Sequence, residues 1–192
     1  MITRENALKI LEDLKNSPNM VKHALACGFA MRDLCNKLSS QSSQPSQPSD
    51  PSIWEIVGLL HDADYEITNK SLDLHTEETT KKLKEINADE QIIDAIRGHC
   101  DKADRKTLMA KSIYAVDELT GLIVACALVQ PDKKLSSVSV ESVLRKFKDK
   151  SFAAGANRDQ IKTCETELII PLQEFVLITL NAMQEKSGEL EL

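Results

Sequence analysis

The apolar run from Ile113 to Val129 constrains the fold of this chain more than any other feature. Two carboxylates, Asp117 and Glu118, interrupt it. The run is shorter than the roughly 20 residues that a membrane span needs, and charges inside a span are costly. We therefore expect a core helix of a globular protein and no membrane partner. An unpaired buried carboxylate costs several kcal/mol, so Asp117 must have a partner in that core.

The rest of the chain favours helices over strands. Gly and Pro number only six each, and β-branched residues rarely alternate with polar ones. Apolar spacing and capping residues predict an all-α bundle of about seven to nine helices. The expected helices run from Thr3 to Leu14, from Ser17-Pro18 to about Leu38, from a Ser52/Glu55 capping box to His61, from Asn87 to His99, from about Lys106 to Val129, through Val140 to Phe147, and from Asn157 onward with a kink at Pro171.

Residues 39–52 read SSQSSQPSQPSDPS. Such a Ser/Gln/Pro tract cannot bury apolar surface, so we expect a flexible loop. The expected helices on either side of it are short and one-sided, so both need the same core. We therefore interpret the tract as an insertion within one domain that covers residues 1–192, a usual domain length.

Charge and cysteine content narrow the class of protein. The 24 basic residues against 30 acidic ones give a net charge of −6, which offers no broad basic surface for a nucleic-acid polymer. Five cysteines without a CxxC pair indicate neither a disulfide framework nor a zinc knuckle. The N-terminus lacks the apolar stretch of a secretory signal. These features fit a cytoplasmic protein with reduced thiols; they do not indicate an oligomeric state.

The few histidines of this chain form an ordered pattern with two aspartates. Imidazole nitrogens and carboxylates are ligands for Mn, Fe, Zn or Ni, and packed helices can bring distant ligands together. A lone histidine is more often a surface or hydrogen-bonded core residue, and an aspartate after a helix is often a cap. The ordered set favours a metal site over these separate explanations. Its members, in the order H…HD…H…H…D, are His23, His61, Asp62, His75, His99 and Asp117.

Three segments carry a family resemblance: HALACG at 23–28, GLLHDAD at 58–64 and AVDELT at 115–120. With them the chain resembles the HD-domain superfamily of metal-dependent phosphohydrolases. The resemblance covers roughly 18–129, which we expect to be the metal-binding core. The stretch KDKSFAAGANRDQI at 148–161 is similar to small bacterial members, and helices within 137–186 are expected to complete the domain.

The resemblance implies one divalent metal ion bound by His23, His61, Asp62 and Asp117. It also implies that Asp62 bridges to a second ion held by His75 and His99. Such a pair could clamp a phosphate and activate a water molecule, which makes Asp62 a catalytic candidate. One or two ions are expected; Fe, Mn, Ni, Mg and Zn all stay open, with Fe or Mn favoured.

The chain departs from the family pattern after the HD pair. Many members read HD-I-G, whereas this chain continues with Ala63 and Asp64, and Tyr65 stands where some nucleotide hydrolases have a glutamate. Asp64 and Glu66 are therefore candidates for a general acid or for a residue that supports a ligand. A solvated loop carboxylate is the alternative for both.

Phosphate recognition needs positive charge. The basic residues around the loop 152–155 are Lys148, Lys150 and Arg158, and the guanidinium fork of an arginine matches phosphate geometry. We expect these three residues to bind substrate, with Arg97 as a weaker candidate. The alternative is a solvated helix end.

Together these features predict hydrolysis of a phosphate ester or anhydride in a small, nucleotide-like molecule. A di-iron oxygenase of the same fold is one alternative. A non-catalytic metal-binding sensor or interaction module is another, although such modules usually lose ligands and this chain keeps all six.

Overall fold

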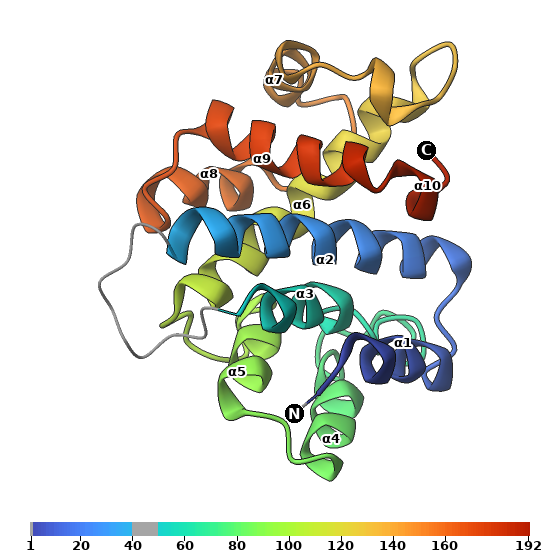
Figure 1. The fold of residues 1–192 in the computed structure, drawn as a ribbon, viewed down its shortest axis with the longest axis vertical. Coiled ribbons are helices and arrows are strands. Elements are labelled where there is room, and N and C mark those ends of the chain that lie inside the picture. Colours follow the sequence, from blue (N-terminus) through green and yellow to red (C-terminus); the bar gives the residue numbers. More distant parts are fainter. Residues whose placement is uncertain (1, 40–49) are drawn as a thin grey trace.

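The computed structural model describes residues 2–39 and 50–192, and this part of the chain is helical without a strand (Figure 1). The all-α fold class is confirmed. Ten α-helices and one 3₁₀ turn are described: α1 (Arg4–Asp13), α2 (Pro18–Ser39), α3 (Pro51–Leu60), α4 (Glu77–Glu85), α5 (Glu90–Gly98), α6 (Leu108–Leu128), η1 (Leu135–Ser137), α7 (Val140–Lys148), α8 (Arg158–Glu167), α9 (Leu172–Glu185) and α10 (Ser187–Leu190). The polar helix α4 and the one-turn helix α10 lack the apolar periodicity by which the others were predicted.

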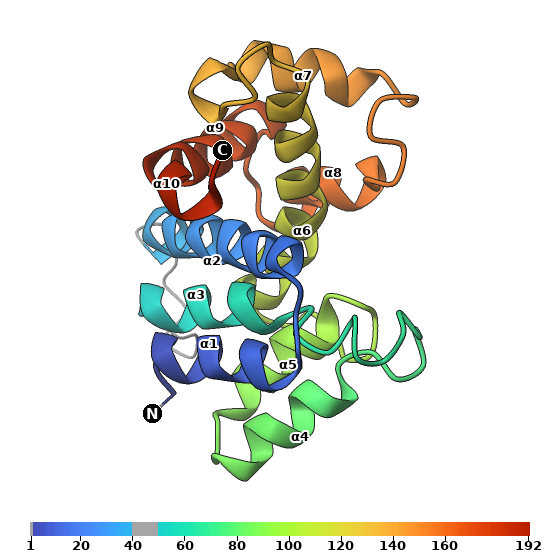
Figure 2. The same ribbon diagram turned by 90° about the vertical axis from the view of Figure 1, so that its right-hand side faces the viewer.

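The long helices α2 and α6 form the centre of the molecule. In both views α2 lies between α3 on one side and α9 on the other, and α6 crosses it (Figures 1 and 2). Most of α6 is buried, as the apolar run predicts. Residues from both helices belong to one continuous hydrophobic core.

Helices α2 and α3 approach each other closely at two glycines. A Cβ atom on Gly58 would lie 2.6 Å from the backbone of Cys27 and Gly28. No side chain fits in that space, so only glycine permits this contact. The approach brings the first turns of α2 beside the end of α3, where His61 follows.

Several predicted helix starts are confirmed, and two are corrected. Thr3 caps α1 in a capping box, and Asn157 caps α8 by accepting from the N–H groups of Asp159 and Gln160. Helix α3 is capped by Asp50 instead of Ser52, because Pro51 occupies its first turn and sets the start two residues earlier. Helix α5 is likewise capped by Asp89 instead of Asn87.

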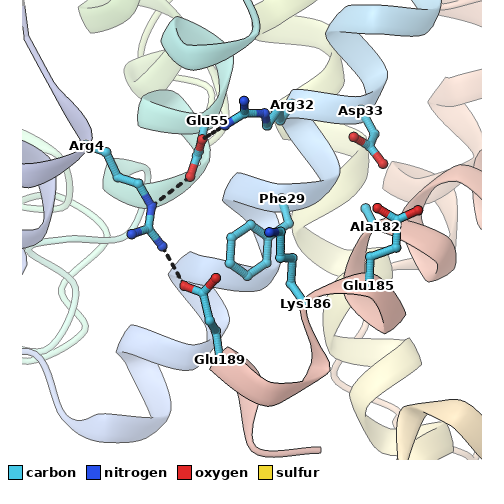
Figure 3. A pocket seen from close by; sticks show the side chains of 9 residues that line it. All are labelled: Arg4, Phe29, Arg32, Asp33, Glu55, Ala182, Glu185, Lys186 and Glu189. Atoms are coloured by element: carbon cyan, nitrogen blue, oxygen red, sulfur yellow. Dashed lines mark hydrogen bonds and ion pairs between the residues drawn. The ribbon is translucent and has the colours of Figure 1, made fainter.

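Glu55 does not take part in a capping box, because it turns inward and binds two arginines. Its carboxylate lies 2.9 Å from Arg4 Nε and 2.8 Å from Arg32 Nη1, and Arg4 also pairs with Glu189 at 2.7 Å (Figure 3). These ion pairs join α1, α2, α3 and α10 around a cavity of about 380 Å³.

Pro171 separates two helices where we expected a kink within one. Helix α8 ends at Glu167, α9 begins at Leu172, and the two meet at 108°. No single helix in the described ranges is both long and apolar enough to cross a membrane, although this bent pair reaches the required length and composition jointly. The expected flexible loop at 39–52 falls mainly at 40–49, outside the described residues, while its ends belong to α2, α3 and the Asp50 cap.

Candidate metal centre

The structure brings all six predicted ligands together from five places in the fold. His23 lies in the second turn of α2, and Asp117 lies in the middle of α6. His61 and His99 are the C-cap residues of α3 and α5, so their side chains leave the helix ends toward the centre. Asp62 follows His61, and His75 precedes the N-cap of α4.

One half of the cluster contains His23, His61 and Asp117. The two imidazole Nε2 atoms are 3.2 Å apart, and Asp117 Oδ1 lies 3.1 Å from that of His23 and 3.4 Å from that of His61. Asp62 Oδ2 lies 3.7 and 3.8 Å from the same two nitrogens. One oxygen of Asp62 and one of Asp117 thus both face the same two imidazole nitrogens.

The other half contains His75 and His99. Their Nε2 atoms are 3.0 Å apart, and each lies 3.1 Å from Asp62 Oδ1. The two oxygens of Asp62 therefore face different histidine pairs, which makes this carboxylate the link between the two halves.

Three of the four imidazoles are oriented through Nδ1. His61 Nδ1 lies 2.8 Å from the carbonyl oxygen of Gly58, and His99 Nδ1 contacts that of Ile96. His75 Nδ1 lies 3.0 Å from Asp64 Oδ1. Donation through Nδ1 leaves Nε2 with its lone pair toward the centre, as a metal ligand requires.

Asp64 is fully buried and holds His75 together with the start of α4. Besides the imidazole, its carboxylate accepts from Thr76 N at 2.8 Å and Thr79 N at 3.1 Å. Thr76 has a φ of 67°, a left-handed conformation that a β-branched residue rarely adopts, and these bonds stabilise it. Of the two predicted roles of Asp64, this position favours support of a ligand, which stays a prediction.

Electrostatic interactions among the clustered histidines and aspartates shift their pKa values. Burial alone would lower the pKa of His61, but Asp62, Cys27 and Asp117 together outweigh it and raise that pKa to about 9. For His75 burial is likewise outweighed by Asp62 and Asp64, which raise its pKa to about 9. Burial would raise the pKa of Asp62 and Asp117, but the facing histidines hold both below their usual value. These shifts favour protonated imidazoles beside ionised carboxylates.

The donor set fits divalent transition metals. Nitrogen ligands bind such ions at about 2.0–2.1 Å, so neighbouring ligand atoms lie about 3.0–3.4 Å apart. The Nε2 and Asp117 Oδ1 contacts of 3.0–3.4 Å match this spacing. Groups of these donor atoms could therefore hold a metal ion.

A cavity of about 570 Å³ opens over the cluster. Five of the six metal-ligand candidates line it, His61 being fully buried behind them, and the loop that carries Gly155 contributes a wall. None of the described residues that line it is a lysine or an arginine. Its other walls come from Tyr65, Leu72, Cys100, Glu118, Gly121, Ala153, Ala156 and Gln160.

The three basic residues that we expected to bind phosphate do not line the cavity. Arg158 donates from its guanidinium to the carbonyl oxygens of Ala153, Ala156 and Phe152, and thus holds the loop instead of facing the cavity. Lys148 and Lys150 are exposed and do not line the cavity. The predicted phosphate-binding role is therefore not supported by the position of any of the three.

Glu66, a catalytic candidate, and Arg97, the weaker phosphate-binding candidate, also contact other residues. Glu66 accepts from the backbone N–H of Ser17 at 2.6 Å and from its hydroxyl at 2.9 Å, so it supports the start of α2 and does not line the cavity. Arg97 donates to Glu77 at 3.0 Å.

Sequence reasoning missed two sulfur atoms beside the cluster. Cys27 lies with the donors of His23, His61 and Asp117, and Cys100 with those of His75 and His99; in each group the atoms are within 4.8 Å of one another. The helical spacing of four residues between His23 and Cys27 was the signal for the first. Cys100 directly follows His99. All five cysteines are free thiols.

The family model described as HD domain matches residues 20–122, more than half of the chain and a span that contains all six candidate ligands. Comparison with curated proteins and with solved structures gives no significant match.

Proposed function

The chain belongs to the HD domain family, and from this we propose that it is a metal-dependent phosphohydrolase acting on a small phosphorylated, nucleotide-like molecule. The fold is of a metal-dependent hydrolase type, and its His, Asp and Cys clusters could hold metal. The six residues of the ordered pattern are the proposed ligands of one or two divalent ions.

The observation that carries the proposal is the position of Asp62. Its Oδ1 contacts the second histidine pair at 3.1 Å, while its Oδ2 faces the first pair at 3.7 and 3.8 Å. A carboxylate shared in this way is the arrangement that a two-ion centre needs.

Bound ions would neutralise phosphate charge and activate a water molecule for attack. The residues of the chain orient the parts. Asp64 keeps His75 facing Asp62. Glu118 accepts from Asn157 N at 2.9 Å, and Gln160 donates to the Tyr114 carbonyl at 2.8 Å, so both tether the start of α8 to α6.

The volume and the lining of the cavity indicate what class of substrate could bind there. Its volume of about 570 Å³ lies in the range of small-molecule sites, roughly 300–1,000 Å³. Its described lining offers carboxylates from Asp62, Asp117 and Glu118 but no lysine or arginine. A phosphorylated substrate would therefore depend on the bound cations for charge neutralisation.

The test is elemental analysis of the purified protein, followed by phosphate release from a nucleotide panel with Mn, Fe, Ni or Mg added. Asp117→Ala removes a carboxylate that two imidazoles share. We expect it to lose metal and turnover while helical content by circular dichroism stays near that of the wild type. Asp104→Asn, a change at an exposed aspartate paired with Lys106, is the control.

Three results would contradict the proposal. Full activity of Asp117→Ala would remove Asp117 from the site. Product formation that stops without oxygen would indicate a di-iron oxygenase. Metal binding without turnover on any phosphorylated compound would indicate a sensor module.

A further inference from the structure

We propose that Cys27 is a ligand of the first metal ion, which would then be held by imidazole, carboxylate and thiolate groups together. The inference rests on the metal centre of the proposed function, although it does not depend on the substrate. It assigns a chemical role to the buried thiol of Cys27, which is not one of the six residues in the ordered pattern of histidines and aspartates.

The position of the sulfur supports this assignment. Cys27 follows His23 by one helical turn, so both side chains leave the same face of α2. The residue is fully buried, and its Sγ lies 3.9 Å from His23 Nε2. The donor atoms of His23, Cys27, His61 and Asp117 all lie within 4.8 Å of one another.

The distance between Cys27 Sγ and His23 Nε2 approaches that between two ligands of one ion. With metal–nitrogen bonds of 2.0–2.1 Å and a metal–sulfur bond of 2.3 Å, nitrogen and sulfur ligands at a tetrahedral angle lie about 3.5 Å apart. The 3.9 Å contact exceeds this by a few tenths of an ångström. A small rotation of the thiol side chain would close the difference.

The packing keeps the sulfur beside the cluster. The backbone of Cys27 is one of the groups that a Cβ atom on Gly58 would strike at 2.6 Å, so it lies against α3. Glycine at position 58 thus allows the helix that carries Cys27 to approach the helix that presents His61.

Thr120 offers a partner for a thiolate. Its Oγ1 lies 3.3 Å from Cys27 Sγ and donates to the carbonyl oxygen of Asp117 at 2.8 Å. Because the hydroxyl has one hydrogen, the thiol must donate to Thr120 while that bond exists. When metal binding removes the thiol proton, the hydroxyl can turn and donate to sulfur, as groups that support metal ligands do.

A thiolate ligand changes which ions the site prefers. Sulfur favours zinc, iron and cobalt over magnesium and manganese. Of the two metals favoured by the family resemblance, this inference selects iron, and it adds zinc as a competitor.

Cobalt(II) provides the test, because thiolate coordination gives an intense charge-transfer absorption in the near ultraviolet. We expect this band when metal-free full-length protein receives one equivalent of Co²⁺. Cys27→Ser and Cys27→Ala should lose it. Cys35→Ser is the matched control, since Cys35 lies on the same helix and is equally buried, and it should keep the band. Cys100→Ser reports on the second histidine pair and should also keep it.

X-ray absorption of the zinc-loaded wild type gives a second readout that needs no variant. A sulfur neighbour at about 2.3 Å from zinc is expected, and its absence would overturn the assignment of Cys27. Persistence of the cobalt band in Cys27→Ser, or its loss only in Cys100→Ser, would do the same. Failure of any Co²⁺ to bind in equilibrium dialysis would instead overturn the metal centre itself, which separates the two proposals.

Discussion

Asp62 couples the two histidine pairs through a single side chain. One carboxylate oxygen faces His23 and His61, and the other contacts His75 and His99. A change at Asp62 should therefore affect both halves at once, whereas residues that support one imidazole should affect one half.

A substitution at Asp64 tests whether a residue that supports one imidazole affects only one half of the cluster. Asp64→Asn replaces the acceptor of the His75 Nδ1 hydrogen bond with an amide that orients the ring less firmly. We expect affinity for the second ion to fall about 10- to 100-fold, with the first ion retained. Metal titration by calorimetry measures both steps.

Glu66→Gln is the control for this variant, because Glu66 contacts Ser17 at the start of α2. It should leave both affinities unchanged. Equal loss of both ions in Asp64→Asn would show that the residue supports the fold as a whole and not His75 in particular.

The histidines also predict a pH dependence. The pKa values of His61 and His75 are raised from 6.5 to about 9, so their protonation stabilises the metal-free fold fully below pH 6.5, and this stabilisation is lost as the pH rises through about 9. Metal competes with these protons. The melting temperature should fall from pH 6.5 to 9 in a chelator, while the increase caused by saturating metal should grow over the same range. A pH-independent increase would contradict this.

At the scale of the elements, the contact of α2 with α3 depends on Gly58. Gly58→Ala would place a methyl group 2.6 Å from the backbone of Cys27 and Gly28, so the helices must separate. We expect a loss of about 1–3 kcal/mol in the free energy of unfolding. Urea denaturation measures it.

Gly121→Ala is the matched control for stability. Gly121 lies within α6 with open space around it, so the same substitution should be neutral or stabilise by up to about 1 kcal/mol. Similar losses in both variants would show that close helix packing is not the cause.

The sequence predicted some elements well because their signals are local. The apolar periodicity of α6 and the caps Thr3 and Asn157 are properties of neighbouring residues. Glu55 was misassigned because its partners, Arg4 and Arg32, come from other helices. No local pattern reveals such long-range ion pairs.

The candidate site likewise contains features that the sequence pattern predicts and features that depend on the folded structure. Six residues of the right types in the right order predicted a cluster that the structure does bring together. The role expected for Arg158 was not supported, because the loop folds its own carbonyl oxygens around the guanidinium. That arrangement depends on the path of the loop and not on residue type.

At the scale of the whole molecule, the proposed ligands join helices α2, α3, α5 and α6 with the segment before α4. An ion that binds only the folded protein at 100 times its dissociation constant stabilises it by about 2.7 kcal/mol. For a chain of this length we expect the melting temperature to rise by about 5–10 °C.

Differential scanning calorimetry with metal and with a chelator measures this increase. The Asp117→Ala variant should show little of it. An equal increase in that variant would place the stabilising ion elsewhere.

The cavity wall that carries Ala153, Gly155, Ala156 and Gln160 lies beyond residue 122, where the family match ends. The cavity is therefore built from two stretches of the chain: the matched stretch supplies the ligand candidates and part of the wall, and the later stretch supplies the rest of the wall. Under the proposed function, a change confined to this later stretch would alter the space above the ligand candidates, and so the compound that fits there, without moving the candidates themselves.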